Sequence, residues 1–308
     1  MAKMLARVAP WLPSAKTAAD SRGGQDVRGG HSGALRVLGA ADTEELWALA
    51  AADPVANIFL LSHLEATGSA APTAAGGRVV GVFEAQELVA ACWAGVNVVP
   101  VGVTADHGPE IGAFLARSGH RYSSIFGPSE AVLSIWSQLR HSSPPPFDIR
   151  ADQPLLQITG PSGVAPAPGL RFAQPADLDV LLPACTAMFE EEVGYSPVSG
   201  GSQHYRQRVK SLIQRRLALA DFDAAGQVVF KAELGTVSTQ AVQIQGVWMN
   251  PAYRGQGLSA AYMSAVVDAA RSLSPVASLY VNHYNAPARA AYDAVGFRQV
   301  GTFATILF

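Results

Sequence analysis

The sequence predicts an α+β protein of two tandem modules, each a mostly antiparallel mixed sheet flanked by helices. Both halves of the chain show the same order of expected elements: strand, helices, three strands, helix, strand, helix, strand. A segment rich in proline and glycine, residues 160–169, separates the halves, and 308 residues suffice for two hydrophobic cores. We therefore expect a flexible arm at 1–33, a first domain at 34–160, a linker at 161–169 and a second domain at 170–308.

The first half begins with a segment, residues 1–33, that is rich in small residues and has little periodicity, which is typical of a flexible arm. Asp42 then suits the N-cap of a helix at 43–51, and Pro54 opens another helix that carries Ile58 and Leu61. Apolar runs rich in β-formers predict strands, and amphipathic runs predict two further helices. The strands are expected at 35–38, 79–83, 88–93, 96–103, 122–126 and 155–158, and the helices at 108–117 and 130–139.

The second half repeats this order of elements without repeating the residues themselves. Its helices are expected at 175–182, 184–192, 204–214, 258–273 and 286–295, and its strands at 170–172, 217–222, 228–233, 242–249, 276–281 and 298–307. Only one strand follows the last helix.

The composition is that of an ordinary globular protein, with 49% hydrophobic residues and 22 basic against 24 acidic side chains. This balance argues against nucleic acid as the main partner, because phosphate binding needs a basic excess. Cys92 and Cys185 stand alone, so neither a disulfide framework nor a metal site is expected. With no apolar run of about 18 residues and no convincing signal peptide, no membrane partner is expected either, and we expect a cytoplasmic protein.

Residues 242–259 organise the second half, because a buried strand there opens into a glycine loop and then a helix. Alternation places Val242, Ile244 and Trp248 on one face of the strand and two glutamines on the other. Gly246 lies inside this strand. A glycine in that position indicates a β-bulge or the close approach of a ligand.

The loop after this strand has the residues of a pyrophosphate site. Arg254 supplies positive charge, Gly255 and Gly257 let backbone amides converge, and the following helix start adds partial positive charge. Two other interpretations fit the same residues. The first is an ordinary strand-helix connection, which would need the same glycines. The second is a dinucleotide fingerprint, because Gly-x-Gly-x-x-Ala ends at Ala260, although that fingerprint requires a glycine at the strand end and an acidic residue about 20 positions later.

These residues resemble the signature of the GNAT superfamily of acetyl-CoA-dependent N-acetyltransferases. That signature is Arg or Gln, two residues, Gly, one residue, then Gly or Ala, and here it reads Arg254, Gly257 and Ser259, with serine in place of the usual last residue. A second family segment, Asn-x-x-Ala-x-x-x-Tyr-x-x-x-Gly-Phe, is matched from Asn285 to Phe297. The resemblance covers about residues 170–308. It implies two GNAT-fold modules, the first of which has lost the phosphate loop. The family usually closes its sheet with a hairpin, whereas only one strand follows the last helix here, so we expect a segment of the first half, such as residues 153–159, to complete the second sheet.

The resemblance also implies acetyl-CoA as cosubstrate, with its pantetheine arm on the strand and its pyrophosphate in the loop. Asn285 is in addition expected to cap the helix at 286–295, by its residue type and position alone. The residues implied in binding are Val247, Trp248, Met249, Arg254, Gly255, Gln256, Gly257, Leu258, Ser259 and Asn285.

Tyr292 matches the family position of the tyrosine that assists the leaving thiolate, although a helical tyrosine is often simply a core residue. The general base is harder to assign. Many relatives use a glutamate on the fourth strand, but Gln243 and Gln245 occupy the site-facing positions here and cannot accept a proton. Glu233 is the nearest alternative base, unless it forms an ion pair with Lys231.

Several residues are further candidates on the acceptor side. The acidic run 190–192 ends a predicted helix and would attract a cationic amine, or it is merely a solvated helix end. The C-terminal carboxylate of Phe308 would end a strand of the second sheet. Tyr195, His204 and Tyr205 belong to the same region and are not ranked.

The sequence thus predicts an N-acetyltransferase that moves an acetyl group from acetyl-CoA to a primary amine. No Cys or Ser stands in a nucleophile motif, so direct attack by the amine is expected. The acceptor is a small molecule, a peptide or a protein lysine. The alternative is a non-catalytic acyl-CoA-binding or interaction protein, which the missing strand glutamate and the altered first module favour.

Overall fold

The computed structural model describes residues 34–199 and 201–308, so the predicted flexible arm at 1–33 lies outside the described residues. The described chain forms two compact units. The C-terminal unit is Pro154–Val300. The N-terminal unit consists of the described residues up to Gln153 together with Gly301–Phe308.

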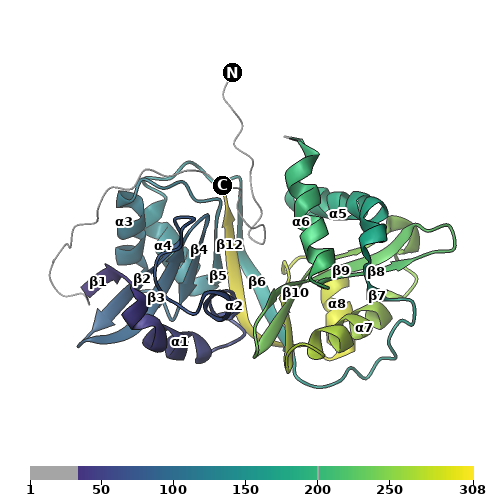
Figure 1. Cartoon of the computed structure of the whole chain (residues 1–308), viewed down its shortest axis with the longest axis horizontal. Helices are drawn as coiled ribbons and strands as arrows, with labels where there is room; N and C mark the ends of the chain where they lie inside the picture. The colour runs from purple at the N-terminus through teal and green to yellow at the C-terminus, as the bar shows by residue number, and fades with distance from the viewer. Residues whose placement is uncertain (1–33, 200) are drawn as a thin grey trace. The chain divides into compact units, whose positions relative to one another are not determined.

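The N-terminal unit is a sheet with strand order β1-β2-β3-β4-β5-β12, antiparallel except where β4 pairs with β5. The helices of this unit follow the predicted pattern (Figure 1). The strands are β1 (Ala34–Val37), β2 (Arg78–Glu84), β3 (Glu87–Ala94), β4 (Asn97–Val101) and β5 (Ser124–Pro128), and the helices are α1 (Thr43–Ala51), α2 (Ile58–Thr67), α3 (Gly108–Arg117) and α4 (Ser129–Leu139).

The C-terminal unit is a sheet with strand order β6-β11-β10-β9-β8-β7, antiparallel except where β10 pairs with β11. Helices α5 and α6 cover one face of this sheet, and α7 and α8 cover the other (Figure 1). The strands are β6 (Asp148–Ile158), β7 (Arg171–Phe172), β8 (Ala218–Phe222), β9 (Val228–Val237), β10 (Ala241–Met249) and β11 (Val276–Tyr280), and the helices are α5 (Leu178–Val193), α6 (Ser202–Gln214), α7 (Ser259–Arg271) and α8 (Ala286–Val295).

Each sheet is completed by a strand from the other half of the sequence. In the C-terminal unit, residues 155–158 of β6 pair antiparallel with β11, which confirms that a first-half segment completes the second sheet. In the N-terminal unit, residues 303–307 of β12 (Arg298–Leu307) pair with β5. Ala304 and Ile306 are fully buried in the core of that unit. The strand predicted at 298–307 therefore contributes mainly to the N-terminal unit.

Helix α5 is the largest local departure from the predicted elements. Helices were expected at 175–182 and 184–192, but a 3-10 turn at Pro175–Asp177 leads into one continuous helix that contains Pro183. Pro183 is the sixth residue of α5, beyond the first turn, so it removes one intrahelical hydrogen bond. Burial of Leu181, Met188 and Phe189 on one side of α5 stabilises the continuous helix.

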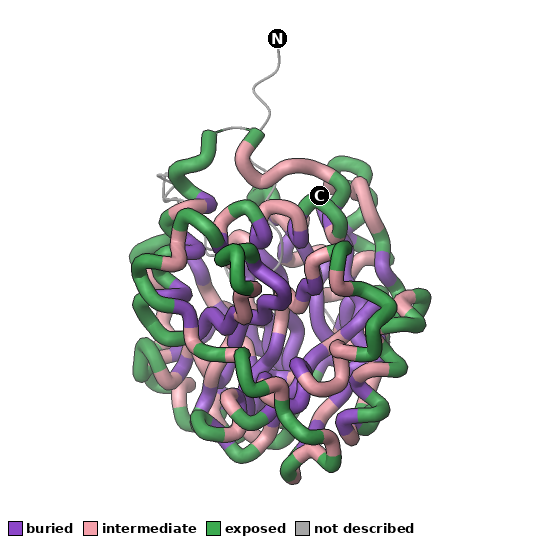
Figure 2. The backbone as a smooth tube through the Cα atoms, turned by 90° about the vertical axis from the view of Figure 1, so that its right-hand side faces the viewer, coloured by how far each residue is buried: buried purple, intermediate pink, exposed green. Residues whose placement is uncertain are grey.

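Buried residues follow the strands, and exposed residues gather at the turns between elements (Figure 2). Among the helices in the described part of the chain, none is long and apolar enough to cross a membrane.

Candidate active site

Strand β10 carries a β-bulge at Gly246, as its sequence predicted. Gln245 pairs with Glu233 and Trp248 pairs with Lys231, so two residues of β10 oppose one residue of β9. Gly246 has φ +57°, a conformation that glycine adopts readily and other residues avoid. The bulge is thus set by the one residue in the strand without a Cβ.

The bulge reverses the side-chain alternation after Gly246, and this corrects the predicted face of Trp248. Its indole Nε1 donates a hydrogen bond of 3.0 Å to Glu191 on α5, so Trp248 lies on the α5 face of the sheet. Met249 turns instead to the α7 face, where its sulfur lies 3.9 Å from the hydroxyl of Ser259. A strict period of two assigns these faces wrongly because one extra residue shifts the register.

Strands β10 and β11 pair for only three residues, from Ala241–Val276 to Gln243–Ser278. Beyond that point β10 continues through the bulge to Met249, and β11 continues to Tyr280, where it pairs with β6. The register pairs of β10 with β11 therefore end before the bulge, which lies between Gln245 and Trp248. An edge of this kind suits an extended ligand that pairs in place of a strand.

The loop between β10 and α7 has the geometry of an anion site. After the 3-10 turn Pro251–Tyr253, Gly255 and Gly257 adopt φ +75° and +74°, and a Cβ at either position would meet nothing within 4 Å. The N-terminus of α7 has no side-chain cap at Leu258, so its first amides are open to an anion. Converging amides with partial positive charge suit the diphosphate of CoA.

The side chains of Arg254 and Gln256 in this loop are already engaged within the protein. Arg254 donates from Nε to the carbonyl of Met249 at 2.9 Å and from Nη2 to the Glu191 carboxylate at 2.8 Å. Gln256 donates to the carbonyl of Ala252 at 3.0 Å. The backbone of the loop is therefore better placed than its side chains for first contact with a diphosphate.

Helix α8 begins as predicted, because the Asn285 side chain accepts a hydrogen bond from the Ala288 amide at 3.3 Å. Tyr292 is buried on this helix, and its ring packs edge-on against Phe297 with centroids 5.9 Å apart. Burial, and secondarily the negative charge of Glu192, raise the pKa of Tyr292 well above its ordinary value. The hydroxyl therefore keeps its proton at neutral pH.

Glu233 lies beneath the bulge, since a Cβ added at Gly246 would be 3.0 Å from its carboxyl carbon. Its two oxygens accept hydrogen bonds of 2.6 Å from Arg208 on α6 and from Lys231 on β9, as the ion-pair alternative foresaw. Burial by itself raises the pKa of Glu233, but the charges and hydrogen bonds of Arg208 and Lys231 outweigh it and lower that pKa to about 2. A carboxylate with such a pKa is a weak proton acceptor.

The rest of this buried cluster was not predicted. Cys185 of α5 lies 3.5 Å from the Lys231 amine, and burial raises the pKa of its thiol. Arg208 is 6% exposed, and its Nη1 has no hydrogen-bond partner. One sequence signal was available. Arg208 falls on the apolar stripe of α6 with Tyr205, Val209 and Leu212, and an arginine in such a stripe requires a buried partner.

The remaining acceptor-side candidates lie in different surroundings from one another. Tyr205 is buried and donates to the Cys185 carbonyl at 2.8 Å, while His204 is exposed at the start of α6. Tyr195 packs edge-on against Phe189. Phe308 follows a strand of the N-terminal unit and packs against Trp136 there, so its carboxylate does not end a strand of the second sheet as expected.

The N-terminal unit has no counterpart of this loop. Its strand β4 leads through Thr104 and Asp106 into α3 without an Arg-Gly-x-Gly segment. At Gly108, the first residue of α3, a Cβ would lie 1.9 Å from the hydroxyl of Ser134 on α4. Close packing by α4 thus fills the space beside the helix start.

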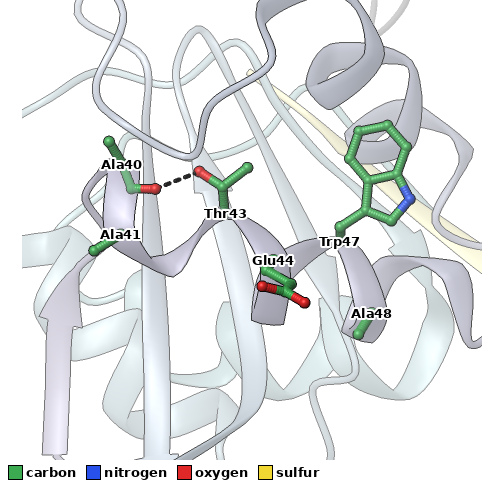
Figure 3. Close-up of a pocket in the computed structure, with 6 residues that line it drawn as sticks. All are labelled: Ala40, Ala41, Thr43, Glu44, Trp47 and Ala48. Atoms are coloured by element: carbon green, nitrogen blue, oxygen red, sulfur yellow. Dashed lines mark hydrogen bonds between the residues drawn. The ribbon is translucent and has the colours of Figure 1, made fainter.

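A pocket of about 550 Å³ in the N-terminal unit lies on η1 (Ala40–Asp42) and α1 (Figure 3). The hydroxyl of Thr43 donates to the carbonyl of Ala40 at 2.7 Å and accepts from the amide of Ala70 at 3.0 Å. The Thr43 hydroxyl is thus committed to local structure, and Glu44 is the one charged residue among the described residues that line the pocket. The lining residues are Ala40, Ala41, Thr43, Glu44, Trp47 and Ala48.

Over residues 34–199 and 201–308, no three His, Cys, Asp or Glu side chains are grouped as a metal ion would require.

Comparison with known proteins supports the arrangement. Residues 186–297 match the model of the Acetyltransferase (GNAT) family, and residues 77–181 match a domain of unknown function (DUF4081). A search of curated proteins found no match.

Solved structures share the fold over most of the chain at low sequence identity. The GCN5-related N-acetyltransferase from Sphaerobacter thermophilus has a TM-score of 0.58 at 16% identity, over 88% of this chain and 94% of that one. An acetyltransferase of the GNAT family from Colwellia psychrerythraea has a TM-score of 0.56 at 12% identity, over 89% and 99%. A tandem GNAT protein from the clavulanic acid biosynthesis pathway has a TM-score of 0.50 at 14% identity, over 88% and 97%.

These structures bear out the predicted tandem α+β architecture, and the family model falls on the half that carries the bulged strand and the glycine loop. The chain has the GNAT fold, and its residues 186–297 match the model of the Acetyltransferase (GNAT) family.

Proposed function

We propose that this protein transfers an acetyl group from acetyl-CoA to a primary amine by direct attack of the amine. One observation carries the proposal. The bulged strand β10 leaves its neighbour β11 after Gln243–Ser278 and leads directly into a glycine loop at an uncapped helix start. An extended thioester arm and a diphosphate need these two sites in this order.

Acyl-CoA binding is assigned to the end of β10, to the glycine loop that leads into α7 and to the start of α8. Backbone groups of Val247, Trp248 and Met249 hold the pantetheine arm and polarise the thioester carbonyl. The amides of the loop and of the first turn of α7 bind the diphosphate. The residues proposed for the loop contacts are Arg254, Gly255, Gln256, Gly257, Leu258 and Ser259, and Asn285 flanks the arm from the start of α8.

In the proposed reaction the amine nitrogen attacks the thioester carbon, the new C–N bond forms, and the C–S bond breaks to release the CoA thiolate. Tyr292 is proposed to donate a hydrogen bond to that sulfur. Its raised pKa keeps the phenol protonated, so it stabilises the departing thiolate mainly as a donor. Catalysis then depends chiefly on positioning the two substrates.

The proton of the attacking amine needs an acceptor, and Glu233 remains the side-chain hypothesis for it. Its ion pairs with Arg208 and Lys231 oppose that role, because they stabilise the carboxylate against protonation. The same ion pairs suit a positioning role, since they fix β9 beneath the bulge at Gly246.

A non-catalytic acyl-CoA-binding protein is the second candidate. The observation that favours it is the presence of Gln243 and Gln245 on β10, where a proton-accepting glutamate would be expected. Turnover distinguishes the two functions, because both require acyl-CoA binding.

The test is release of free CoA thiol from acetyl-CoA across a panel of small amines, peptides and proteins with lysines. Cys92 and Cys185 are both free but buried, so the protein's own thiols should react slowly and leave a low background. We expect acceptor-dependent release and one CoA bound per chain by calorimetry. Binding without turnover on any acceptor would favour the second candidate, and two equivalent sites per chain would contradict the assignment to the C-terminal unit.

A further inference from the structure

The C-terminal turn of α5 bears two adjacent carboxylates that reach different strands. Glu191 accepts hydrogen bonds from Arg254 at 2.8 and 3.1 Å and from the Trp248 indole at 3.0 Å. Glu192 accepts one of 3.3 Å from Asn282, just after β11. The two side chains therefore connect α5 to β10 and its loop on one side and to the end of β11 on the other.

These contacts lie beyond the point where the β10–β11 ladder ends. The ladder stops at Gln243–Ser278, whereas Trp248 is five residues further along β10 and Asn282 four residues further along the chain from Ser278. The pair Glu191–Glu192 thus holds both separated strand ends from one helix turn.

Two anions can pair with Arg254, namely the Glu191 carboxylate and a diphosphate bound at the glycine loop. In the structure its guanidinium is held by the Glu191 carboxylate, and both side chains are nearly half exposed, at 45% and 47%. An exposed ion pair of this kind contributes little to stability, because water screens both charges. A diphosphate at the neighbouring glycine loop offers the same guanidinium more negative charge and more acceptor oxygens, so exchange toward the diphosphate is favourable.

We propose that Glu191 is a specificity-determining residue that competes with the diphosphate of CoA for Arg254. Binding of the diphosphate withdraws Arg254 from Glu191, and the last turn of α5 then loses one of its two contacts on the β10 side. The competition lowers affinity for every ligand that recruits Arg254. A pantetheine thioester without a diphosphate leaves the Arg254–Glu191 pair intact. This inference rests on the proposed acyl-CoA binding.

The experiment measures the Kd of CoA and of pantetheine by calorimetry on the full chain and its variants. In Glu191→Gln the competing charge is removed, so CoA should bind about three- to fivefold more tightly, which is the upper end of the effect of losing an exposed ion pair. Pantetheine affinity should not change. In an Arg254→Gln background, the further change Glu191→Gln should have no effect on CoA affinity.

Glu190→Gln is the matched control, because Glu190 is exposed and its substitution removes the same charge from the same helix turn. It should leave CoA affinity unchanged.

The outcomes separate this inference from the proposed function. A wild-type chain that binds no CoA contradicts the proposed function and the competition together. Wild-type binding with equal or weaker affinity in Glu191→Gln overturns the competition alone and makes Glu191 a support for Arg254. An equal gain in Glu190→Gln also overturns it, because the effect would then be one of general charge.

Discussion

Arg171 donates two hydrogen bonds to the carboxylate of Asp177, at 2.7 and 3.0 Å, and so connects strand β7 to the turn before α5. Arg36 and Asp42 form the same pair in the N-terminal unit, at 2.8 and 2.6 Å, before α1. In both units the aspartate also accepts a backbone amide three residues earlier. The sequence had indicated a repeat of element order only, and this contact shows a repeat of residues and geometry.

We predict that Asp177→Ala destabilises the C-terminal unit, because it removes both the arginine's partner and a capping carboxylate. The expected loss is about 1–2 kcal/mol of unfolding free energy. The hydrogen bond from Arg171 holds the pKa of Asp177 below its ordinary value, so the contribution is present above about pH 4 and disappears as pH falls below it.

Urea titrations at pH 7 and pH 3 measure this difference. Asp42→Ala is the matched variant in the N-terminal unit, where the pKa of Asp42 is also lowered by Arg36. Equal midpoints for wild type and Asp177→Ala at pH 7 would show that the pair has no stabilising role.

Gly257→Asp should weaken CoA binding more than tenfold, which corresponds to about 1.4 kcal/mol. The new side chain has room, since nothing lies within 4 Å of the Cβ position, but it places a negative charge at the proposed diphosphate site. Gly257→Asn is the control, because asparagine has the same shape, tolerates the φ of +74° and carries no charge. Calorimetry should show a much larger loss for Asp than for Asn, and similar losses would mean that backbone strain is the cause.

Tyr292→Phe should lower kcat by about 10²- to 10⁴-fold while CoA affinity stays nearly constant. The phenylalanine ring preserves the packing against Phe297 and removes only the hydroxyl. Steady-state kinetics with a saturating acceptor provide kcat, and calorimetry provides the CoA Kd. Turnover at the wild-type rate would identify Tyr292 as a core residue without a part in catalysis.

Glu233→Gln should destabilise the C-terminal unit by about 3–5 kcal/mol, because Arg208 and Lys231 are then buried without their counter-ion. The pKa of Glu233, about 2 in the folded chain, lies below its ordinary value near 4.5. Its contribution is therefore present above about pH 4.5 and is lost as pH falls through about 2.

Adding Lys231→Met to Glu233→Gln should recover part of the stability, since one unpaired cation is removed. The pH dependence of kcat distinguishes a general base from a positioning residue at Glu233. A folded Glu233→Gln variant that loses turnover and also the acidic limb of its pH profile would support the general base, whereas a variant with reduced stability and an unchanged profile would support positioning.

A fragment that begins at Gly169 should be poorly soluble. It lacks residues 155–158 of β6, which pair with β11, and it keeps residues 303–307 of β12 without their partner β5. Two strands would then expose unpaired edges, which favours aggregation. A monodisperse fragment by light scattering that binds CoA would show that the exchanged strands are dispensable.

The sequence alone determined the parts of this protein that depend on local chemistry. Period-two and period-three-to-four patterns located most helices and strands, Asn285 was identified as a cap, and a bulge was one of two interpretations given for Gly246. The Arg254–Gly257 loop was found because glycine adopts its backbone conformation more readily than other residues. Such features are encoded within a few residues, so they can be read without knowing the fold.

Only the tertiary structure decided which distant residues meet. The pairing of β6 with β11 was expected, but the return exchange, in which β12 pairs with β5 of the N-terminal unit, was not, because no local pattern records which sheet edge lies unpaired. Glu233 gained its low pKa from Arg208 and Lys231, and Arg208 is 25 residues away in sequence. The orientation of Trp248 followed from one extra residue in β10, and its partner Glu191 lies 57 residues earlier. Packing and charge act through space, so these contacts exist only once the chain has folded.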